Sequence, residues 1–270
     1  MKHWVRRLLE SFGLALVSVE EKQSIRNALL GKYWLQDLFK EAVEISGKSV
    51  ILEGDWIELS QSQLGQDLLA LATFGPERKG FFVEFGATDG KTLSNTWFLE
   101  KYFGWTGILA EPARVWKDNL LKERDCSIDL RCVYKQSGEL VTFSETSVGE
   151  LSTISKFSES DMHASSRRKS LDYFVETVTL HDLLLQHRAP KFIDFLSIDT
   201  EGSEFEILEN FDFSKFDFGL ICIEHNFTPQ RALTRALLQD NGYMQILNHY
   251  SKFDDWYIPK DKLGETMYRI

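Results

Sequence analysis

Acidic residues that follow short apolar runs are the residues of this sequence best suited to bind and transform a ligand. The first such run, residues 81–85, contains Glu84 and leads into a turn that holds Gly86, Asp89 and Gly90. Glycines in a turn between a strand and a helix let backbone amides approach a bound nucleoside closely. The spacing therefore predicts a nucleoside-binding turn at residues 84–90.

A second acid completes this pattern. Residues 107–110 form another apolar run, which ends at Glu111 and Pro112. A carboxylate at this position of an α/β sheet can accept hydrogen bonds from both ribose hydroxyls, and a proline stiffens the turn that carries it. An acid that merely favours the N-terminus of a helix is the alternative. The spacing from Glu84 favours the ribose role.

The charge of the first turn distinguishes between nucleotide cofactors. Glu84 opens the turn with an acid, and the gap between Gly86 and Gly90 is longer than in the dinucleotide fingerprint. A pyrophosphate needs amide donors and is disfavoured by neighbouring carboxylates. S-adenosylmethionine, which carries a sulfonium, an amino group and ribose hydroxyls, fits better than NAD. A tight turn with incidental acids is the alternative.

A third acidic group follows the apolar run 195–198. Asp199 and Glu201 come directly after it, and Glu204 begins the expected helix. Because the carboxyl ends of parallel strands open on one edge of a sheet, Asp199 and Glu201 should face the cofactor or the acceptor. They could act as a general base, metal ligands or hydrogen-bond acceptors. Glu204 is expected to be a structural acid of the first helical turn.

One histidine is expected at the same edge. His225 follows the run 219–224, and a neutral imidazole can take a proton from a hydroxyl near neutral pH. A plain polar role is the alternative.

The elements that position these residues alternate along the chain. This alternation predicts a mostly parallel sheet with helices on both faces. Strands are expected at residues 81–85, 107–110, 128–133, 140–143, 192–198, 219–224 and 243–247, and helices at 61–74, 93–102, 115–122, 204–210 and 229–240. Residues 144–172, rich in serine and charge, lack periodicity, which is typical of an active-site loop, a lid or a disordered segment. A lid that binds the acceptor is the leading interpretation.

Residues 1–50 are expected to be a helical extension of the domain at residues 51–270. An apolar stripe runs from Trp4 to Leu16, with Lys2, Arg6 and Arg7 on the other side. A basic amphipathic helix can make a peripheral contact with an anionic membrane. A helix packed on its own domain or on a partner is the favoured alternative. A second helix is expected at residues 33–45.

Composition narrows the class of protein. The 270 residues carry a net charge of −10, which argues against nucleic acid as a partner because there is no basic surplus. Three cysteines without a CxxC spacing indicate neither a disulfide framework nor a zinc cluster. We expect a reducing, cytoplasmic location. No apolar run is long enough to cross a bilayer, and no signal peptide is evident.

Taken in order, these motifs resemble the FkbM family of S-adenosylmethionine-dependent methyltransferases. The matching stretches are Ser-Gln-Leu-Gly-Gln-Asp at 62–67, Val-Glu-Phe-Gly-Ala-x-x-Gly at 83–90, Ser-Asn-Thr at 94–96, Gly-Trp-x-Gly-x-Leu-x-Glu-Pro at 104–112 and Ile-Asp-x-Glu-Gly-x-Glu at 198–204. The resemblance runs from about residue 60 to residue 250. Gln66 stands where the family pattern has a glutamate.

The resemblance implies a class I methyltransferase fold, Rossmann-like, with a seven-stranded sheet of six parallel strands and one antiparallel strand. It implies O-methylation of a hydroxyl on a sugar, glycan, glycolipid or natural product. It also places Asp199 and Glu201 beside the transferring methyl. The implied cofactor-binding residues are Asp67, Glu84, Gly86, Ala87, Gly90, Asn95, Thr96, Glu111, Pro112 and Asp199.

The leading hypothesis is an O-methyltransferase in which His225 or Asp199 is the base and Glu201 positions the acceptor. If Asp199 and Glu201 hold a divalent cation, the metal would lower the pKa of the hydroxyl instead. One alternative is a nucleotide-dependent oxidoreductase on the same sheet. Another is a non-catalytic scaffold that docks to a partner or a membrane. An oligomeric assembly is left open.

Overall fold

The computed structural model describes residues 19–146, 152–157 and 170–262, with side chains from residue 31 onward. The chain divides into two compact units, Met1–Asp37 and Leu38–Ile270. Helix α2 (Val19–Ser46) confirms the helix expected at residues 33–45. The apolar stripe expected between Trp4 and Leu16 lies outside the described residues.

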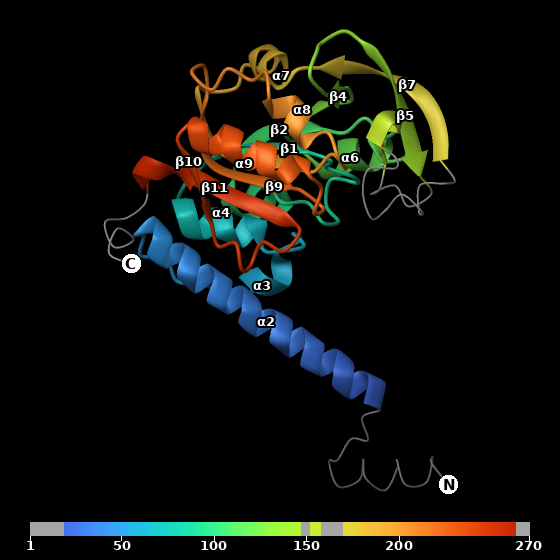
Figure 1. The fold of residues 1–270 in the computed structure, drawn as a ribbon. Coiled ribbons are helices and arrows are strands. Elements are labelled where there is room, and N and C mark those ends of the chain that lie inside the picture. Colours follow the sequence, from blue (N-terminus) through green and yellow to red (C-terminus); the bar gives the residue numbers. More distant parts are fainter. Residues whose placement is uncertain (1–18, 147–151, 158–169, 263–270) are drawn as a thin grey trace, which may run out of the picture. The chain divides into compact units, whose positions relative to one another are not determined.

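A mixed sheet of seven strands forms the centre of the larger unit (Figure 1). The strand order is β10-β11-β9-β8-β1-β2-β3, and β11 is the strand that runs antiparallel to its neighbours. The strands are β1 (Phe81–Phe85), β2 (Thr106–Ala110), β3 (Ser127–Asp129), β8 (Phe192–Ile198), β9 (Asp217–Glu224), β10 (Tyr243–Ile246) and β11 (Asp254–Pro259). The chain order reverses between β1 and β8, and such a switch point is where open α/β sheets bind ligands.

Helices cover both faces of this sheet, as predicted. The helices are α3 (Trp56–Leu59), α4 (Gln66–Phe74), α5 (Trp97–Phe103), α6 (Lys117–Glu123), α7 (Leu180–Gln186), α8 (Glu204–Leu208) and α9 (Gln230–Asp240). Apolar side chains of α7, α8 and α9 share one core with Val83 and Phe85 of β1. On the other face, Phe74 of α4 lies against Gly219, and Arg124 lies over the ring of Phe82.

A second, four-stranded sheet was not expected. Its order is β4-β7-β5-β6, with β4 (Cys132–Val133), β5 (Leu140–Thr146), β6 (Thr153–Ile154) and β7 (Ser170–Val178). The single strand predicted at residues 128–133 is therefore wrong. The backbone and side chain of Arg131 both donate to the Asp129 carboxylate, which forms a turn that ends β3 before β4 begins.

The prediction of an irregular lid at residues 144–172 is also wrong at its ends. β5 continues to Thr146, β7 begins at Ser170, and β6 is followed by a short 3₁₀ helix, η2 (Ser155–Phe157). Residues 147–151 and 158–169 lie outside the described part of the chain. None of the helices in the described ranges combines the length and apolarity that a membrane crossing needs. Cys126, Cys132 and Cys222 are free thiols.

Candidate active site

A cavity of about 490 Å³ lies at the carboxyl ends of the parallel strands. This volume is typical of small-molecule sites, and this edge is where α/β sheets bind their ligands. The main sheet contributes residues from the ends of β1, β2, β8 and β9 and from the start of β11. The second sheet adds an apolar wall made of Cys132, Val133, Phe143 and Ile154.

Gly86 lines the cavity where β1 and β8 converge. Its φ is +76°, a conformation that favours glycine. A Cβ at this position would lie 2.0 Å from the carbonyl oxygen of Asp199. Only glycine therefore lets the two strand ends approach this closely.

Glu111 and Pro112 also line the cavity, next to the end of β2. The Glu111 carboxylate accepts hydrogen bonds from the backbone N–H of Thr88 at 2.9 Å and of Ala113 at 2.8 Å. Burial raises the pKa of Glu111 to about 7. Each carboxylate oxygen keeps a further acceptor site, so Glu111 can still receive hydroxyl donors from a ligand.

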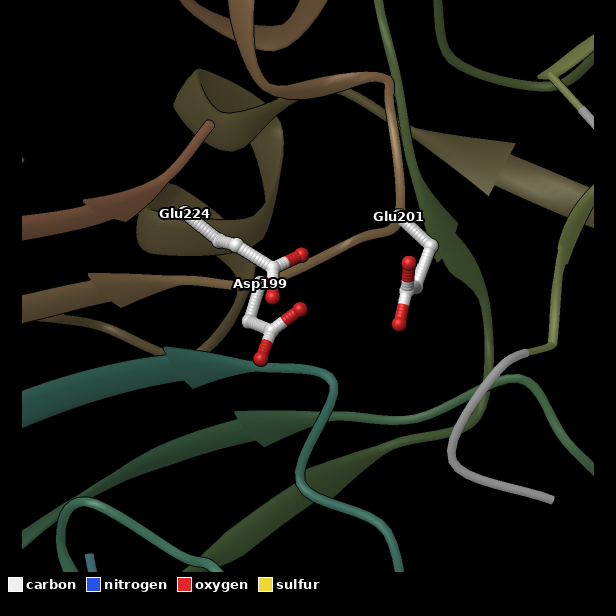
Figure 2. A group of neighbouring side chains, drawn as sticks. All are labelled: Asp199, Glu201 and Glu224. Carbon is white, nitrogen blue, oxygen red and sulfur yellow. The ribbon is translucent and has the colours of Figure 1, made fainter. Parts of the chain in front are cut away.

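Three carboxylates meet at the centre of the cavity. Asp199, Glu201 and Glu224 each place an oxygen within 4.8 Å of the others (Figure 2). Burial raises the pKa of Asp199 to about 7. Burial, and then the nearby charges of Asp199 and Glu201, raise the pKa of Glu224 well above its ordinary value. Such a group of oxygens could also bind a divalent cation.

Glu224 was not among the predicted site residues, although a signal for it exists. It is the last residue of β9, so the rule that singled out Glu111 at the end of β2 applies to it as well. His225, the next residue, drew attention instead because histidine is the more common base near neutral pH.

Asp254 is the fifth carboxylate of the cavity and was missed as well. Its Oδ2 accepts hydrogen bonds from Gln66 Nε2 at 2.8 Å and from Trp256 Nε1 at 3.2 Å. Burial raises the pKa of Asp254 to about 6. Gln66 is thus a donor to a buried acid, a role that the glutamate of the family pattern could fill only when protonated.

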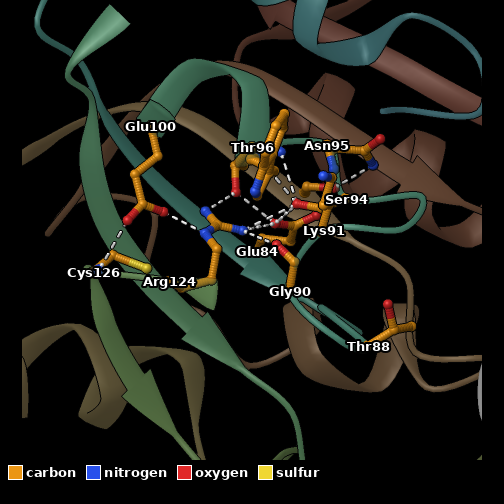
Figure 3. A network of polar contacts seen from close by, with 12 residues as sticks. Glu84, Thr88, Gly90, Lys91, Ser94, Asn95, Thr96, Glu100, Arg124 and Cys126 are labelled. Atoms are coloured by element: carbon orange, nitrogen blue, oxygen red, sulfur yellow. Dashed lines mark hydrogen bonds and ion pairs between the residues drawn. The ribbon is translucent and has the colours of Figure 1, made fainter. Parts of the chain in front are cut away.

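Glu84 does not line the cavity but organises the loop beside it (Figure 3). Its carboxylate accepts hydrogen bonds from the Ser94 hydroxyl at 2.9 Å, the Asn95 backbone N–H at 2.7 Å and the Thr96 hydroxyl at 2.5 Å. The buried guanidinium of Arg124 lies 3.7 Å from the same carboxylate. Glu84 therefore stabilises the loop by accepting its hydrogen bonds and is not positioned to contact a ligand.

Asn95 is the residue that this loop presents to the cavity. Its Nδ2 donates to the Ser197 hydroxyl at 2.9 Å, while its Oδ1 is buried without a hydrogen-bond partner. An unpaired buried acceptor is costly, so a ligand donor at this position would be stabilised. The predicted placement of Asn95 at the site thus agrees with the geometry.

Four other predicted cofactor residues lie outside the cavity lining: Asp67, Ala87, Gly90 and Thr96. Asp67 is fully buried, and its carboxylate accepts hydrogen bonds from the hydroxyls of Ser60 and Ser62, both at 2.6 Å. A Cβ on Gly90 would clash with Leu120 and Arg124, so a glycine is needed here for the turn to pack closely against α6 and the residue that follows it. Their roles are those of a scaffold around the site.

His225 also lies outside the cavity lining. Its Nδ1 accepts the backbone N–H of Phe227 at 3.0 Å, and its Nε2 lies 3.7 Å from Asp255. Burial lowers the pKa of His225, so it stays neutral. The base predicted at His225 is therefore not brought to the cavity, because the side chain after Glu224 points to the opposite side of β9.

Comparison with known proteins identifies the family of the chain. The model of the methyltransferase FkbM domain matches residues 84–245, a span that includes Gly86, Glu111, Asp199, Glu201 and Glu224. The chain belongs to the FkbM methyltransferase family. This FkbM methyltransferase has no match among curated proteins.

Solved structures show weaker likenesses. The chain is similar to precorrin-6y C5,15-methyltransferase from Geobacter metallireducens GS-15, with 12% identity and a TM-score of 0.39 over 76% of this chain and 94% of that chain. It is also similar to a fibrillarin/Nop5p complex, with 12% identity and a TM-score of 0.37 over 77% and 86%. A Methanococcus jannaschii fibrillarin pre-rRNA processing protein gives 13% identity and a TM-score of 0.36 over 74% and 75%.

Proposed function

We propose that this protein transfers the methyl group of S-adenosylmethionine to a hydroxyl on a sugar, glycan or glycolipid. The observation that carries the proposal is the charge of the cavity. Among the described residues that line it, five are carboxylates and none is lysine, arginine or histidine. Such a lining favours a cationic sulfonium amino acid and disfavours a pyrophosphate.

The residues at the cavity fit this cofactor. Glu111 would accept the ribose hydroxyls, Gly86 would admit the ligand close to the backbone, and the unpaired Oδ1 of Asn95 would accept a donor from it. Bound S-adenosylmethionine supplies an electrophilic methyl group on its sulfonium. The protein then has to orient an acceptor oxygen and remove its proton.

Asp199 and Glu224 are placed to remove that proton. They lie together in the cavity, and both pKa values are raised by burial: that of Asp199 to about 7, and that of Glu224 well above its ordinary value. An ionised Asp199 can accept the proton of the acceptor hydroxyl, and Glu201, across from it, can position that hydroxyl. We therefore assign the base to Asp199, supported by Glu224.

The rival functions are disfavoured by the same lining. A nucleotide-dependent oxidoreductase would need donors for a pyrophosphate, which the carboxylates oppose. A non-catalytic scaffold would have no use for five acids in one cavity, because removing them from water costs stability. The free thiols suit a reducing compartment, and we place the activity in the cytoplasm. Peripheral membrane contact is tested by comparing vesicle flotation of the wild type and an R6E/R7E variant.

Isothermal titration tests the cofactor assignment directly. We expect S-adenosylmethionine to bind and NAD not to bind. Transfer from radiolabelled S-adenosylmethionine to a panel of p-nitrophenyl glycosides then tests the acceptor class. Repeating the transfer after EDTA treatment, with and without added Mg²⁺, decides whether the acidic group needs a cation. Binding of NAD in preference to S-adenosylmethionine would overturn the proposal.

A further inference from the structure

A threonine of the second sheet reaches the acidic turn of the active site. Thr153 in β6 is 1% exposed. Its hydroxyl oxygen lies 3.0 Å from the carbonyl oxygen of Glu201 and 3.2 Å from that of Thr200. A hydroxyl has one proton, so these two carbonyls share it. The contact joins the second sheet to the turn that follows β8.

The turn that Thr153 contacts has a strained backbone. Glu201 has a φ of +58°, in the left-handed region that side chains other than glycine rarely adopt. Such conformations persist only where the surroundings hold them, and they gather at functional sites. Because Glu201 carries one of the three central carboxylates, its backbone conformation decides where that carboxylate lies.

The turn is held from two sides. From α8, the Glu204 carboxylate accepts hydrogen bonds from the backbone N–H of Thr200 at 3.0 Å and of Gly202 at 2.9 Å. From β6, the Thr153 hydroxyl donates to the carbonyls of Thr200 and Glu201. Glu204 therefore satisfies the donors of the turn, and Thr153 satisfies its acceptors.

The residues beside Thr153 belong to the cavity. Ser152 and Ile154 both line it, so the alternation along β6 points Thr153 toward the turn. Three residues after Thr153, Lys156 forms an ion pair with Glu206 of α8 at 2.7 Å. The segment is thus held at two points, by the turn after β8 and by α8.

We propose that Thr153 is a positioning residue for the transfer reaction, whose hydroxyl keeps the Glu201 turn left-handed and its carboxylate facing Asp199 and Glu224. The inference rests on the proposed function of the cavity and gives the second sheet a part in it. Without the hydroxyl, the carbonyls of Thr200 and Glu201 lose the hydrogen bond from Thr153. The backbone of Glu201 can then relax, and its carboxylate moves away from the other two.

A graded series of substitutions tests this inference. Thr153→Ser keeps the hydroxyl, Thr153→Cys leaves a weak donor, and Thr153→Val removes the donor. Thr177→Val is the matched control, since the buried Thr177 hydroxyl of β7 also donates to two carbonyls, those of Gln136 and Glu139 between β4 and β5, outside the cavity lining.

The readout is the pH dependence of S-adenosylmethionine affinity, measured by isothermal titration between pH 5.5 and 8.5. Burial, then the charge of Asp199 and then the negative charge of Glu201 raise the pKa of Glu224. If that charge moves away, the midpoint of the affinity curve should shift to lower pH by about half a unit or more. We expect this shift in Thr153→Val, a smaller one in Thr153→Cys, and none in Thr153→Ser or Thr177→Val.

Hydrogen exchange of the amides at residues 200–203 gives a second measurement that needs no cofactor. We expect exchange about tenfold faster in Thr153→Val and unchanged in Thr153→Ser. Unchanged midpoint and exchange in Thr153→Val would overturn the inference, as would a serine variant that behaves like the valine variant. If Thr153→Val does not fold, Thr153→Cys must show both changes or the inference fails. Absence of cofactor binding by the wild type would defeat the proposed function, while exchange still decides whether Thr153 holds the turn.

Discussion

Burial and the nearby acidic groups raise the pKa values of four carboxyl groups of the cavity, those of Glu111, Asp199, Glu224 and Asp254. Asp199 and Glu111 have pKa values of about 7, and Asp254 has one of about 6. A cationic ligand that enters the cavity stabilises the ionised forms and releases protons. Both the affinity for the cofactor and the removal of the acceptor proton should therefore depend on pH.

The pH dependence of methyl transfer follows from this chemistry. The base must be ionised to accept a proton, and the pKa of Asp199 is raised to about 7. The rate should rise with pH through about 7 and then level off. Asp199→Asn should lower the transfer rate by about 100-fold or more. A pH–rate profile that falls between pH 6 and 8 would contradict the assignment of Asp199 as base.

Removal of the ribose acid should act on binding. Glu111→Ala should weaken S-adenosylmethionine affinity by at least about tenfold, because a charged acceptor of two hydroxyls is worth about 1.5–3 kcal/mol per hydrogen bond. Asp240→Asn, an exposed acid at the end of α9, is the control. Isothermal titration compares the three proteins, and equal affinities would remove Glu111 from the cofactor site.

At the scale of elements, the close approach of β1 and β8 makes the cavity. Gly86 permits this approach because both its φ and its missing Cβ are needed. Gly138, in the turn before β5, has an almost identical φ of +77° but has open space around its Cα. At Gly138 a substitution would therefore carry only the free-energy cost of the backbone conformation, whereas at Gly86 it would also carry the cost of a steric clash.

A pair of alanine substitutions tests this distinction. Gly138→Ala should lower the free energy of unfolding by about 1–2 kcal/mol, the cost of a left-handed alanine. Gly86→Ala should lower it further and abolish cofactor binding, because its Cβ would displace the Asp199 backbone. Urea denaturation measures both, and similar losses for the two variants would mean that the strand ends tolerate separation.

The elements also show what the sequence can predict. Strand ends at Gly86, Glu111 and Asp199 were predictable because apolar runs that stop at glycine or an acid mark the carboxyl edge of a parallel sheet. β11 was missed because its first residues, Asp254 and Asp255, are acids. Both acids are buried in the folded protein, where Gln66 donates to Asp254 and Arg231 donates to Asp255. These donors are distant in sequence, so a local pattern does not reveal them.

Side-chain direction set a second limit. The run 81–85 predicts a strand but not which of its residues reaches the ligand, and Glu84 points instead to the loop at residues 94–96. The helix predicted to begin at residue 93 begins at Trp97, because residues 94–96 form a loop that donates hydrogen bonds to the Glu84 carboxylate. Contacts of this kind depend on tertiary packing, which local sequence patterns do not contain.

At the scale of the whole molecule, the cavity should make the ligand-free protein less stable as pH rises. The folded pKa values of Glu111, Asp199 and Asp254 lie above their ordinary values. Between the two values the folded state binds more protons than the unfolded state, so the free energy of unfolding falls with increasing pH. For Glu111 alone, the rise from 4.5 to about 7 corresponds to about 3 kcal/mol.

Urea denaturation at pH 5.5 and pH 7.5 measures this effect. The free energy of unfolding should fall by more than about 2 kcal/mol between them, although the lowered pKa of His225 offsets part of the change. Saturating S-adenosylmethionine should reduce the fall, because its cationic groups stabilise the ionised carboxylates. Constant or rising stability over this range would show that the cavity acids are not desolvated.

Titration of the protein with S-adenosylmethionine at pH 7.5 tests directly whether the acidic cavity is a cofactor site. We expect saturable binding of one cofactor per chain, no detectable binding of NAD, and a loss of at least about tenfold in affinity for Glu111→Ala. A folded protein that fails to bind S-adenosylmethionine, or that binds NAD instead, would contradict this expectation.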